Sequence, residues 1–348
     1  MSTLYDVARA AGVSTATVSR VVHDQAGVRS ATRQRVLEVI AELGYVPDGA
    51  AQSMARRRKE VVGLVMTESR GPETQVEQDG LLFIDEVLRG VDTALAPVGW
   101  SVLISVVRSD GPDARQQLRT VAAKVDGMLI SEGIVDSGEL ALLTAHTPVV
   151  LVAGSADEPH ADVVCVDNDY GTTALTDHLI GRHGRRRLFY VDGPPEAPDA
   201  RERRRAFEKV VARHADATLT GSFQGRFATV SGQQAAREIL AGPRGELPDA
   251  IVCANDQMAI GVMRELRAAG IRVPADIAVT GFDDIHLGAM FSPPLTTVRQ
   301  SMREVGKRAC AMLLERIANP DLPRRSERLP VELIVRESCG CPPHATPA

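Results

Sequence analysis

The spacing of apolar residues differs between the first 60 residues and the rest of the chain. The first stretch carries them at the spacing of one helix face, at Leu4, Val7, Ala8 and Ala11. Gly12 ends that pattern, and Ser14 can cap a second helix whose buried side carries Val18, Val21 and Val22. A third helix from Ser30 to Gly44 is expected to bury Val36, Leu37, Ile40 and Leu43. The pattern therefore predicts a small all-α head.

Beyond residue 60, short apolar runs typical of strands alternate with stretches of helical spacing. The strand-like runs are 61–66, 101–107, 127–130, 149–152, 163–166, 188–191, 250–253 and 277–280. The helical stretches include 83–96, 172–181, 203–213 and 258–269. Such alternation predicts an α/β fold of doubly wound parallel sheets with helices on both faces. Eight strands exceed one compact lobe, so we expect two similar lobes.

Composition and charge narrow the class of protein. The 348 residues are 44% hydrophobic and 24% charged, and no apolar run has the 18 residues that a membrane span needs. The beginning of the sequence does not resemble a signal peptide, and five scattered cysteines argue against a disulfide framework. We therefore expect a cytoplasmic protein with no membrane partner. Residues 1–60 carry nine basic and six acidic residues, against 31 and 39 in the remainder. A basic head suits a polyanionic partner, although a solvated face would look the same.

Two short helices joined by a glycine turn and supported by a third form the helix-turn-helix module, whose second helix enters the DNA major groove. Arg20 can donate two hydrogen bonds to a guanine, and Thr15 and Ala16 offer a hydroxyl and a methyl group to base edges. Thr17 and Ser19 can contact phosphates, which fixes the register. The alternative is a helical cap on a larger protein, with Arg20 solvated.

The string Asp6-Val-Ala-Arg-Ala-Ala-Gly-Val-Ser-Thr-Ala-Thr-Val-Ser-Arg20-Val-Val resembles the N-terminal signature of the lac-repressor family of transcription regulators. The resemblance continues through Thr32-Arg33, Ala41-Glu-Leu-Gly-Tyr45 and Pro47, and then along nearly the whole chain. It implies a homodimer that binds palindromic operator DNA, most often as a repressor. It also implies a two-lobed core like a type I periplasmic binding protein, with a small-molecule effector between the lobes.

Residues 47–60 are expected to form a hinge helix and linker. A helix of about two turns is unstable alone in water, and Gly49 weakens it further. By resemblance, paired hinge helices enter the minor groove, where Met54 stands in place of the family's usual leucine as an apolar wedge. The other hinge positions expected at the DNA are Ala51, Gln52, Ser53 and Ala55. The alternative is a linker without DNA contact.

In the core, ligands of open α/β sheets bind beyond the carboxyl ends of strands. That rule and the resemblance together select Arg203, Phe223, Asn255 and Asp283, and Phe83 on the first core helix is a fifth candidate. The family-like segments are Ala200-Arg-Glu-Arg203, Ala254-Asn-Asp-Gln-Met-Ala-Ile-Gly261 and Val279-Thr-Gly-Phe-Asp283-Asp284. A guanidinium, an amide, a carboxylate and a ring suit a small polyhydroxylated or anionic molecule. The alternatives are a surface salt bridge for Arg203 and core packing for Phe223.

Two neighbouring acids are assigned structural parts: Asp256 is expected to cap the helix beginning at Gln257, and Asp284 to accept hydrogen bonds. The predicted domains are a head at 1–46, the hinge at 47–60, a core at 61–340 and a tail at 341–348. The N-lobe is expected at about 61–162 and 292–320, and the C-lobe at 163–290 and 322–340. The chain would then cross between lobes near 163–167, 291 and 319–323.

Catalytic and metal motifs are not evident. There is no phosphate-binding loop and no G-x-S-x-G motif, and paired acids such as Asp283-Asp284 are commonly turn formers. Cys339 and Cys341 have only His344 near them in sequence, so we expect a disordered tail and no zinc site. The sequence therefore predicts a regulator without cofactor, metal or enzymatic activity. The weaker alternatives are a solute-binding protein and a sugar-processing enzyme.

Overall fold

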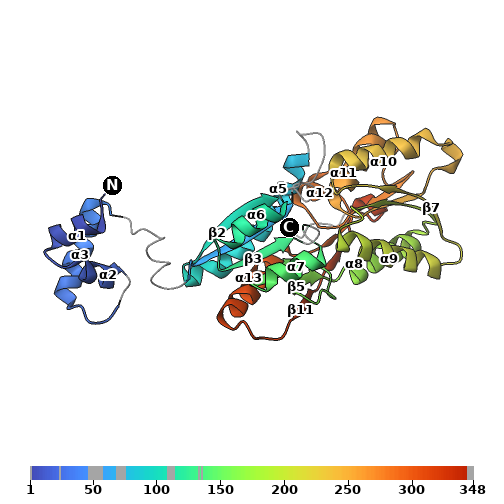
Figure 1. Ribbon diagram of the computed structural model, residues 1–348. Coiled ribbons are helices and arrows are strands. Elements are labelled where there is room, and N and C mark those ends of the chain that lie inside the picture. The colour runs from blue at the N-terminus through green and yellow to red at the C-terminus, as the bar shows by residue number, and fades with distance from the viewer. Residues whose placement is uncertain are drawn as a thin grey trace. The chain divides into compact units, whose positions relative to one another are not determined.

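The computed structural model describes residues 2–22, 25–45, 58–67, 76–107, 114–131, 134 and 136–342; for 67, 76–84 and 244 it describes the backbone alone. The chain divides into two compact units, Met1–Glu60 and Val61–Ala348, and each is treated by itself. Figure 1 shows the helical first unit and the α/β second unit. Among the described residues, no helix is both long and apolar enough to cross a membrane.

The first unit is a bundle of three helices, α1 (Leu4–Ala11), α2 (Thr15–Val22) and α3 (Ser30–Leu43). Helix α1 begins with a capping box, in which the backbone N–H of Thr3 donates to the Asp6 carboxylate at 2.9 Å and the Thr3 hydroxyl accepts from the Asp6 N–H. It ends at Gly12, whose φ of 64° is left-handed. Helix α2 is capped as expected, because the Thr17 N–H donates to Ser14 Oγ at 3.2 Å.

The head buries fewer residues of its third helix than expected. Val7, Val18 and Val21 are buried with Val36, but Leu37 and Leu43 are 46% and 38% exposed. The prediction that both leucines are core residues was wrong for this unit. Helix α3 has 14 residues and packs against two helices of eight, which cover only the side of it that carries Val36.

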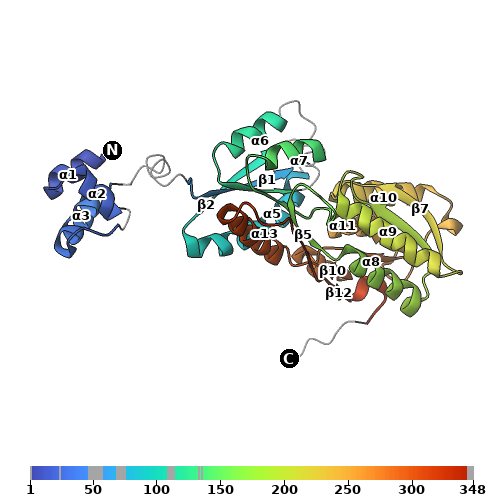
Figure 2. The ribbon, with the colours of Figure 1, turned by 60° about the horizontal axis from the view of Figure 1, so that its bottom comes forward.

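The first sheet of the core has the strand order β11-β5-β4-β3-β1-β2, with every pairing parallel. Its strands are β1 (Val61–Thr67), β2 (Ser101–Val107), β3 (Gly127–Ser131), β4 (Val149–Val152), β5 (Asp162–Val166) and β11 (Ser326–Leu329). Leu64 and Leu129 face α5 (Val76–Leu95) and α13 (Met302–Ala318). Met128 and Ile130 face the opposite layer, formed by α6 (Ala114–Ala122) and α7 (Ser137–Thr144). Figure 2 shows these two layers on either side of the sheet.

The second sheet has the order β7-β6-β8-β9 and is also parallel. Its strands are β6 (Arg187–Asp192), β7 (Thr218–Gln224), β8 (Ala250–Cys253) and β9 (Ala278–Thr280). Helices α8 (Asn168–Asp177) and α9 (Pro198–Arg213) cover one face, and α10 (Thr229–Ala241) and α11 (Asp256–Ala268) cover the other (Figure 1). The short helix α12 (His286–Met290) and the antiparallel pair β10 (Thr297–Arg299) and β12 (Glu332–Ile334) follow beyond β9. The doubly wound α/β prediction is confirmed.

Two of the expected crossings between lobes lie further along the chain than predicted. Thr296 and Arg299 still bridge to Thr280 and Asp283 of the second lobe, so the second crossing follows Arg299 and not Phe291. Strand β11 pairs with β5 in the first sheet, so the third crossing follows Leu329. The expected boundaries at 292 and 322 were therefore wrong. Strand pairing decided both positions, and a single sequence does not reveal which strands pair.

Both lobes contain a pair of helices in backbone contact. A Cβ added to Gly90 of α5 or to Gly306 of α13 would lie 2.0 Å or 2.2 Å from a carbonyl oxygen of the facing helix. Gly232 of α10 and Gly261 of α11 are in the same situation, at 1.9 Å and 2.0 Å. Only glycine lets these helices approach so closely.

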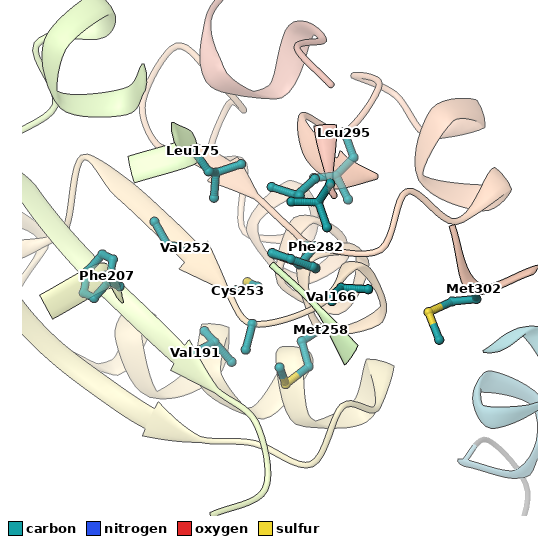
Figure 3. Close-up of a cluster of buried hydrophobic side chains, with 14 of the residues drawn as sticks. Val166, Leu175, Val191, Phe207, Val252, Cys253, Met258, Phe282, Leu295 and Met302 are labelled. Carbon is teal, nitrogen blue, oxygen red and sulfur yellow. The ribbon is translucent and has the colours of Figure 1, made fainter. Parts of the chain in front are cut away.

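One hydrophobic cluster extends across both sheets of the core. Val166 of β5 and Val252 of β8 belong to it, together with Phe282 and Leu295 from the segment that follows β9 and Met302 of α13 (Figure 3). Because apolar burial is the main favourable term in folding, this shared cluster holds the two lobes in one unit.

Candidate functional sites

The second helix of the head presents two of its predicted DNA contacts to solvent. Ala16 and Arg20 are exposed and lie one turn apart, whereas Val18 between them is buried. Thr15, Thr17 and Ser19 are half-buried, and the Thr17 hydroxyl hydrogen-bonds to Ser14 Oγ at 3.0 Å. The arrangement leaves Arg20 able to reach a base edge, and the individual contacts remain predictions.

Residues 47–57 of the predicted hinge lie outside the described residues. This applies to Ala51, Gln52, Ser53, Met54 and Ala55, so their assignment as minor-groove contacts also stays a prediction.

Arg203 is the centre of a polar cluster in the core. It projects from the second turn of α9, which Pro198 begins, and its side chain is only 3% exposed. Its Nε donates to Asn168 Oδ1 at 2.8 Å and one Nη donates to the Ala254 carbonyl at 2.7 Å. Its guanidinium carbon lies 3.7 Å from the centre of the Phe282 ring. The alternative of a surface salt bridge is therefore wrong.

Two carboxylates face Arg203 at ion-pair distance without a direct hydrogen bond. Asp283 Oδ1 lies 3.6 Å from one Nη, and Asp199 Oδ2 lies 3.9 Å from the other. Burial raises the pKa of both carboxyl groups and outweighs the opposing effect of Arg203; the pKa of Asp283 rises to about 7. Gln300 also donates to Asp283 Oδ1. The Asp283 carboxyl group thus changes its charge near neutral pH.

Asn255 is buried at the start of α11, where its polar atoms are engaged by the protein. Its Oδ1 accepts from the Met258 N–H at 3.1 Å, which makes Asn255 the N-cap of the helix. Its Nδ2 donates to the Phe227 carbonyl at 3.0 Å and also to Gln257. Asn255 therefore shapes the loop beside Arg203, and a direct contact with an effector remains a prediction.

Asp256 does not cap that helix, and the prediction that it does was wrong by one residue. Its carboxylate is fully buried and accepts from the Thr297 hydroxyl at 2.5 Å and from the Ile285 N–H at 2.9 Å. It therefore joins α11 to the segment after β9. Asp284 is a structural acceptor as expected, for Arg336 at 2.6 Å and Arg299 at 2.7 Å.

The two aromatic candidates differ in what the structure says of them. Phe223, near the end of β7, is half-buried, packs against the hydrophobic cluster and pairs in register with Val191. Phe83 lies in α5, and its side chain is outside the described part of the chain. A third ring, that of Phe227, would lie 2.5 Å or less from a Cβ added to Gly193, in the loop after β6. The position of Phe227 makes it a ring candidate that the sequence analysis missed.

Three other polar residues of the cluster were also missed. Asn168 is 1% exposed, and its Nδ2 donates to Asp199 at 2.8 Å and to Glu202 at 3.0 Å. Asn168 begins α8 directly after β5, so the rule of strand ends could have selected it. Asp199 lies four residues before Arg203 on α9, a spacing that predicts proximity. No local signal selects Gln300.

We expected a disordered end of the chain without a zinc site because only His344 lies near the two cysteines in sequence, and that premise was incorrect. Cys339 and Cys341 are 0% and 9% exposed, and Cys339 belongs to the 3-10 turn η4 (Glu337–Cys339). Both thiols lie beside His178 and His183, which are some 160 positions earlier in the sequence. A second ligand pair therefore exists in space.

Comparisons with known proteins cover both units. Residues 3–48 match the profile of bacterial regulatory proteins of the lacI family, and residues 176–339 match that of a periplasmic binding protein-like domain. A relative from Aliivibrio fischeri named "HTH-type transcriptional repressor PurR" is 35% identical over 345 residues, covering 97% of this chain and 98% of the relative.

Two solved structures resemble the whole chain. A lac repressor dimer bound to operator and the anti-inducer ONPF has a TM-score of 0.85 at 29% identity and covers 97% of this chain and 99% of its own. A complex described as transcriptional regulator CelR with cellobiose has a TM-score of 0.71 at 30% identity, covering 97% and 100%. The names of these relatives describe transcriptional regulators.

Proposed function

Because the chain belongs to the lacI family of bacterial regulatory proteins, and is a transcriptional repressor of that type with a DNA-binding head and a ligand-binding core, we propose that a small neutral polyhydroxylated molecule bound at Arg203 sets its affinity for operator DNA. The proposal assigns the recognition of DNA to Arg20 and its neighbours, and the recognition of effector to the ends of β6, β8 and β9.

The incomplete hydrogen bonding of Arg203 carries the proposal. A guanidinium has five N–H groups, and among the described residues those of Arg203 make two hydrogen bonds. The nearest carboxylates stand at 3.6 Å and 3.9 Å, beyond hydrogen-bond distance. A ligand oxygen that accepts from Arg203 would satisfy the remaining donors.

The charge around Arg203 favours a neutral ligand over an anion. Asp199 and Glu202 both accept from Asn168, which itself accepts from Arg203, and Asp283 lies on the other side. One guanidinium and its partner Asn168 thus lie among three carboxyl groups, which leaves little net positive charge to attract an anion. A sugar hydroxyl can accept from the arginine and donate to a neighbouring carboxylate, which matches this arrangement of donors and acceptors. The resemblance to the cellobiose-bound regulator supports a sugar.

On the DNA side, we propose that two copies of the chain bind a palindrome. One helix reads only a few base pairs, and two heads related by a twofold axis read twice as many. The lac repressor dimer bound to operator supports this assembly. Residues 47–60 would couple the two functions, because a short hinge helix is stable only when DNA and its twofold mate hold it. Effector binding would shift that equilibrium.

The effector half is tested by thermal-shift screening of neutral sugars and of anionic metabolites against the full-length protein, since a binder raises the melting temperature. Calorimetry with the best binder then compares wild type with Arg203→Met and with Arg205→Met, an exposed arginine on the same helix. We expect only the Arg203 variant to lose affinity. Binding confined to anions, or equal in the two variants, would contradict the proposal.

The coupling is tested on operator DNA selected from random duplexes. Thermodynamic reciprocity requires the effector to change DNA affinity by the factor by which DNA changes effector affinity. Met54→Ala should weaken binding to the selected duplex more than to random DNA at fixed salt, as measured by fluorescence anisotropy. Equal losses on both would remove the wedge role of Met54.

A further inference from the structure

A cluster of four potential metal ligands lies beyond the C-terminal end of α8, the end of that helix opposite to Asn168. His178 begins the π-helical turn η2 (His178–Arg182) that continues α8, and His183 follows that turn; Cys339 and Cys341 lie near the end of the described chain. Their ligand atoms all lie within 4.8 Å of one another. Neither the proposed function nor the family resemblance uses these residues.

The distances within the cluster approach those of a tetrahedral zinc site. The His178 and His183 Nε2 atoms are 3.2 Å apart; Cys341 Sγ is 3.3 Å from His183 Nε2 and 3.6 Å from His178 Nε2; and Cys339 Sγ is 3.4 Å from His178 Nε2. Bond lengths of about 2.05 Å for Zn–N and about 2.3 Å for Zn–S give tetrahedron edges of about 3.3 Å between nitrogens and about 3.6 Å between nitrogen and sulfur.

Hydrogen bonding alone does not account for the arrangement. His178 Nε2 has three close neighbours: the two thiols and the other imidazole. A ring nitrogen carries either one proton or one lone pair, so it can satisfy only one of them fully. A single cation between the four atoms would accept a lone pair from each of them.

The backbone brings each pair of ligands together by a specific device. The π-helical turn, with its i→i+5 hydrogen bonding, brings residues five apart to one side of the helix. The centres of the His178 and His183 rings lie 4.9 Å apart. Between the cysteines, Gly340 has a left-handed φ of 111°, and a Cβ there would lie 3.2 Å from His183 Nδ1. Both devices are local features that ordinary helix or turn geometry would not supply.

We propose that His178, His183, Cys339 and Cys341 bind one Zn²⁺ ion in a closed structural site. Two thiolates balance the charge of the ion and two neutral imidazoles complete the tetrahedron, with the two thiol protons released on binding. The site fastens η4 to α8. Within η4, the Ser338 hydroxyl donates to the Val279 carbonyl at 2.6 Å and accepts from the Thr296 N–H at 2.8 Å. Zinc thereby stabilises the segment that packs against β9.

The first test is the metal content of the full-length protein purified without an affinity tag that binds metals. Elemental analysis should find one zinc per chain in the wild type and less than a tenth of that in Cys339→Ser/Cys341→Ser. Cys310→Ala, which alters a buried cysteine outside the cluster, and His146→Gln should retain the full amount. The wild-type value does not depend on whether any variant folds.

The second test follows the metal directly. Removing the ion with a chelator should lower the melting temperature of the wild type and of Cys310→Ala, and zinc should restore it with release of protons. His183→Gln should show a smaller change. Cobalt substituted for zinc should give the visible absorption of a tetrahedral thiolate complex. A reduced wild-type protein that contains no zinc and takes up none, or a native Cys339–Cys341 disulfide, would overturn the proposal.

Discussion

Two arginines of the core are equally buried, but their surroundings differ. Arg203 and Arg316 are each 3% exposed. Arg316 places its Nε and one Nη on the carboxylate of Asp162 at 2.9 Å, and its other donors reach the carbonyls of Pro320, Leu322 and Pro323. All five N–H groups of Arg316 therefore have partners, whereas those of Arg203 make two hydrogen bonds within the described chain.

Arg316 has the surroundings of a buried charge with a structural role, and Arg203 those of the ligand contact that we propose. A buried ion pair repays its desolvation only when the geometry is good and the remaining donors are satisfied. Arg316 meets that condition, and it joins the end of α13 to β5 and to the segment that leads to β11. Arg203 does not meet it, and its neighbours instead have raised pKa values. A site that keeps unsatisfied donors in place is preorganised for a ligand.

The largest effect is expected for Arg316→Met. This change leaves the carboxylate of Asp162, which is 0% exposed, without its partner. We expect a loss of about 3–5 kcal/mol in the free energy of unfolding, measured by urea denaturation. Arg308→Met, a change on the same helix that breaks a surface pair with Glu327 of β11, should cost less than about 1 kcal/mol. Adding Asp162→Asn to Arg316→Met should recover part of the loss; similar costs for the two arginines would break the comparison.

Arg203→Met should affect ligand binding more than it affects the stability of the fold. We expect effector affinity to fall at least about tenfold, equivalent to about 1.4 kcal/mol. The free energy of unfolding should fall by less than for Arg316→Met, because the Asp199 and Asp283 carboxyl groups have raised pKa values and can take up protons when the guanidinium is removed. Calorimetry and urea denaturation of the same preparation measure both quantities. A large stability loss with unchanged ligand affinity would assign Arg203 a structural role.

Asp283→Asn should flatten part of the pH dependence of stability. The pKa of Asp283 is about 7 in the folded chain, raised by burial, against about 3.9 when unfolded. The folded state therefore holds a proton that the unfolded state has lost between pH 4 and 7, so this contribution to stability falls as the pH rises through that window. The slope from one group is at most about 1.4 kcal/mol per pH unit. Denaturation is measured at several pH values, and the assignment is refuted if the free energy of unfolding changes with pH in the same way for wild type and variant.

The smallest effect is expected for Gln300→Met. This change removes the hydrogen bond that Gln300 donates to Asp283, which holds the pKa of that carboxyl group down. Its pKa should rise further, and the free energy of unfolding near pH 8 should fall by about 0.5–1.5 kcal/mol. The difference should shrink in the Asp283→Asn background, because an amide oxygen accepts a weaker hydrogen bond than a carboxylate, and a double-mutant cycle measures that coupling.

The sequence predicted those features that depend on short-range pattern. The Ser14 cap of the second helix, the end of the first helix at Gly12 and the apolar runs of the two sheets all have local signals, and all are present. Arg203 and Asp283 were selected because both follow strands in family-like segments. The contact of Arg203 with Asn168 joins residues 35 positions apart on different helices, and no local signal announces it.

Two of the errors share one cause, which is pairing across long distances in sequence. The position of β11 in the first sheet depends on its register with β5, about 160 residues earlier. The cluster of His178 with Cys341 escaped for the same reason, because only neighbours along the chain were considered as ligands. The capping error at Asp256 is smaller and differs in kind. Both Asn255 and Asp256 suit an N-cap, but the Asp256 carboxylate accepts from the Thr297 hydroxyl, and Asn255 caps the helix.

The paired glycines limit how either lobe can change shape. Since carbonyl oxygens of one helix rest where side chains of the other would begin, α5 cannot turn or slip against α13, nor α10 against α11, without steric collision. Each pair of helices must therefore move as one rigid body. A rearrangement that leaves these contacts intact would turn about the three segments that cross from lobe to lobe, and would rotate one helix pair relative to the other.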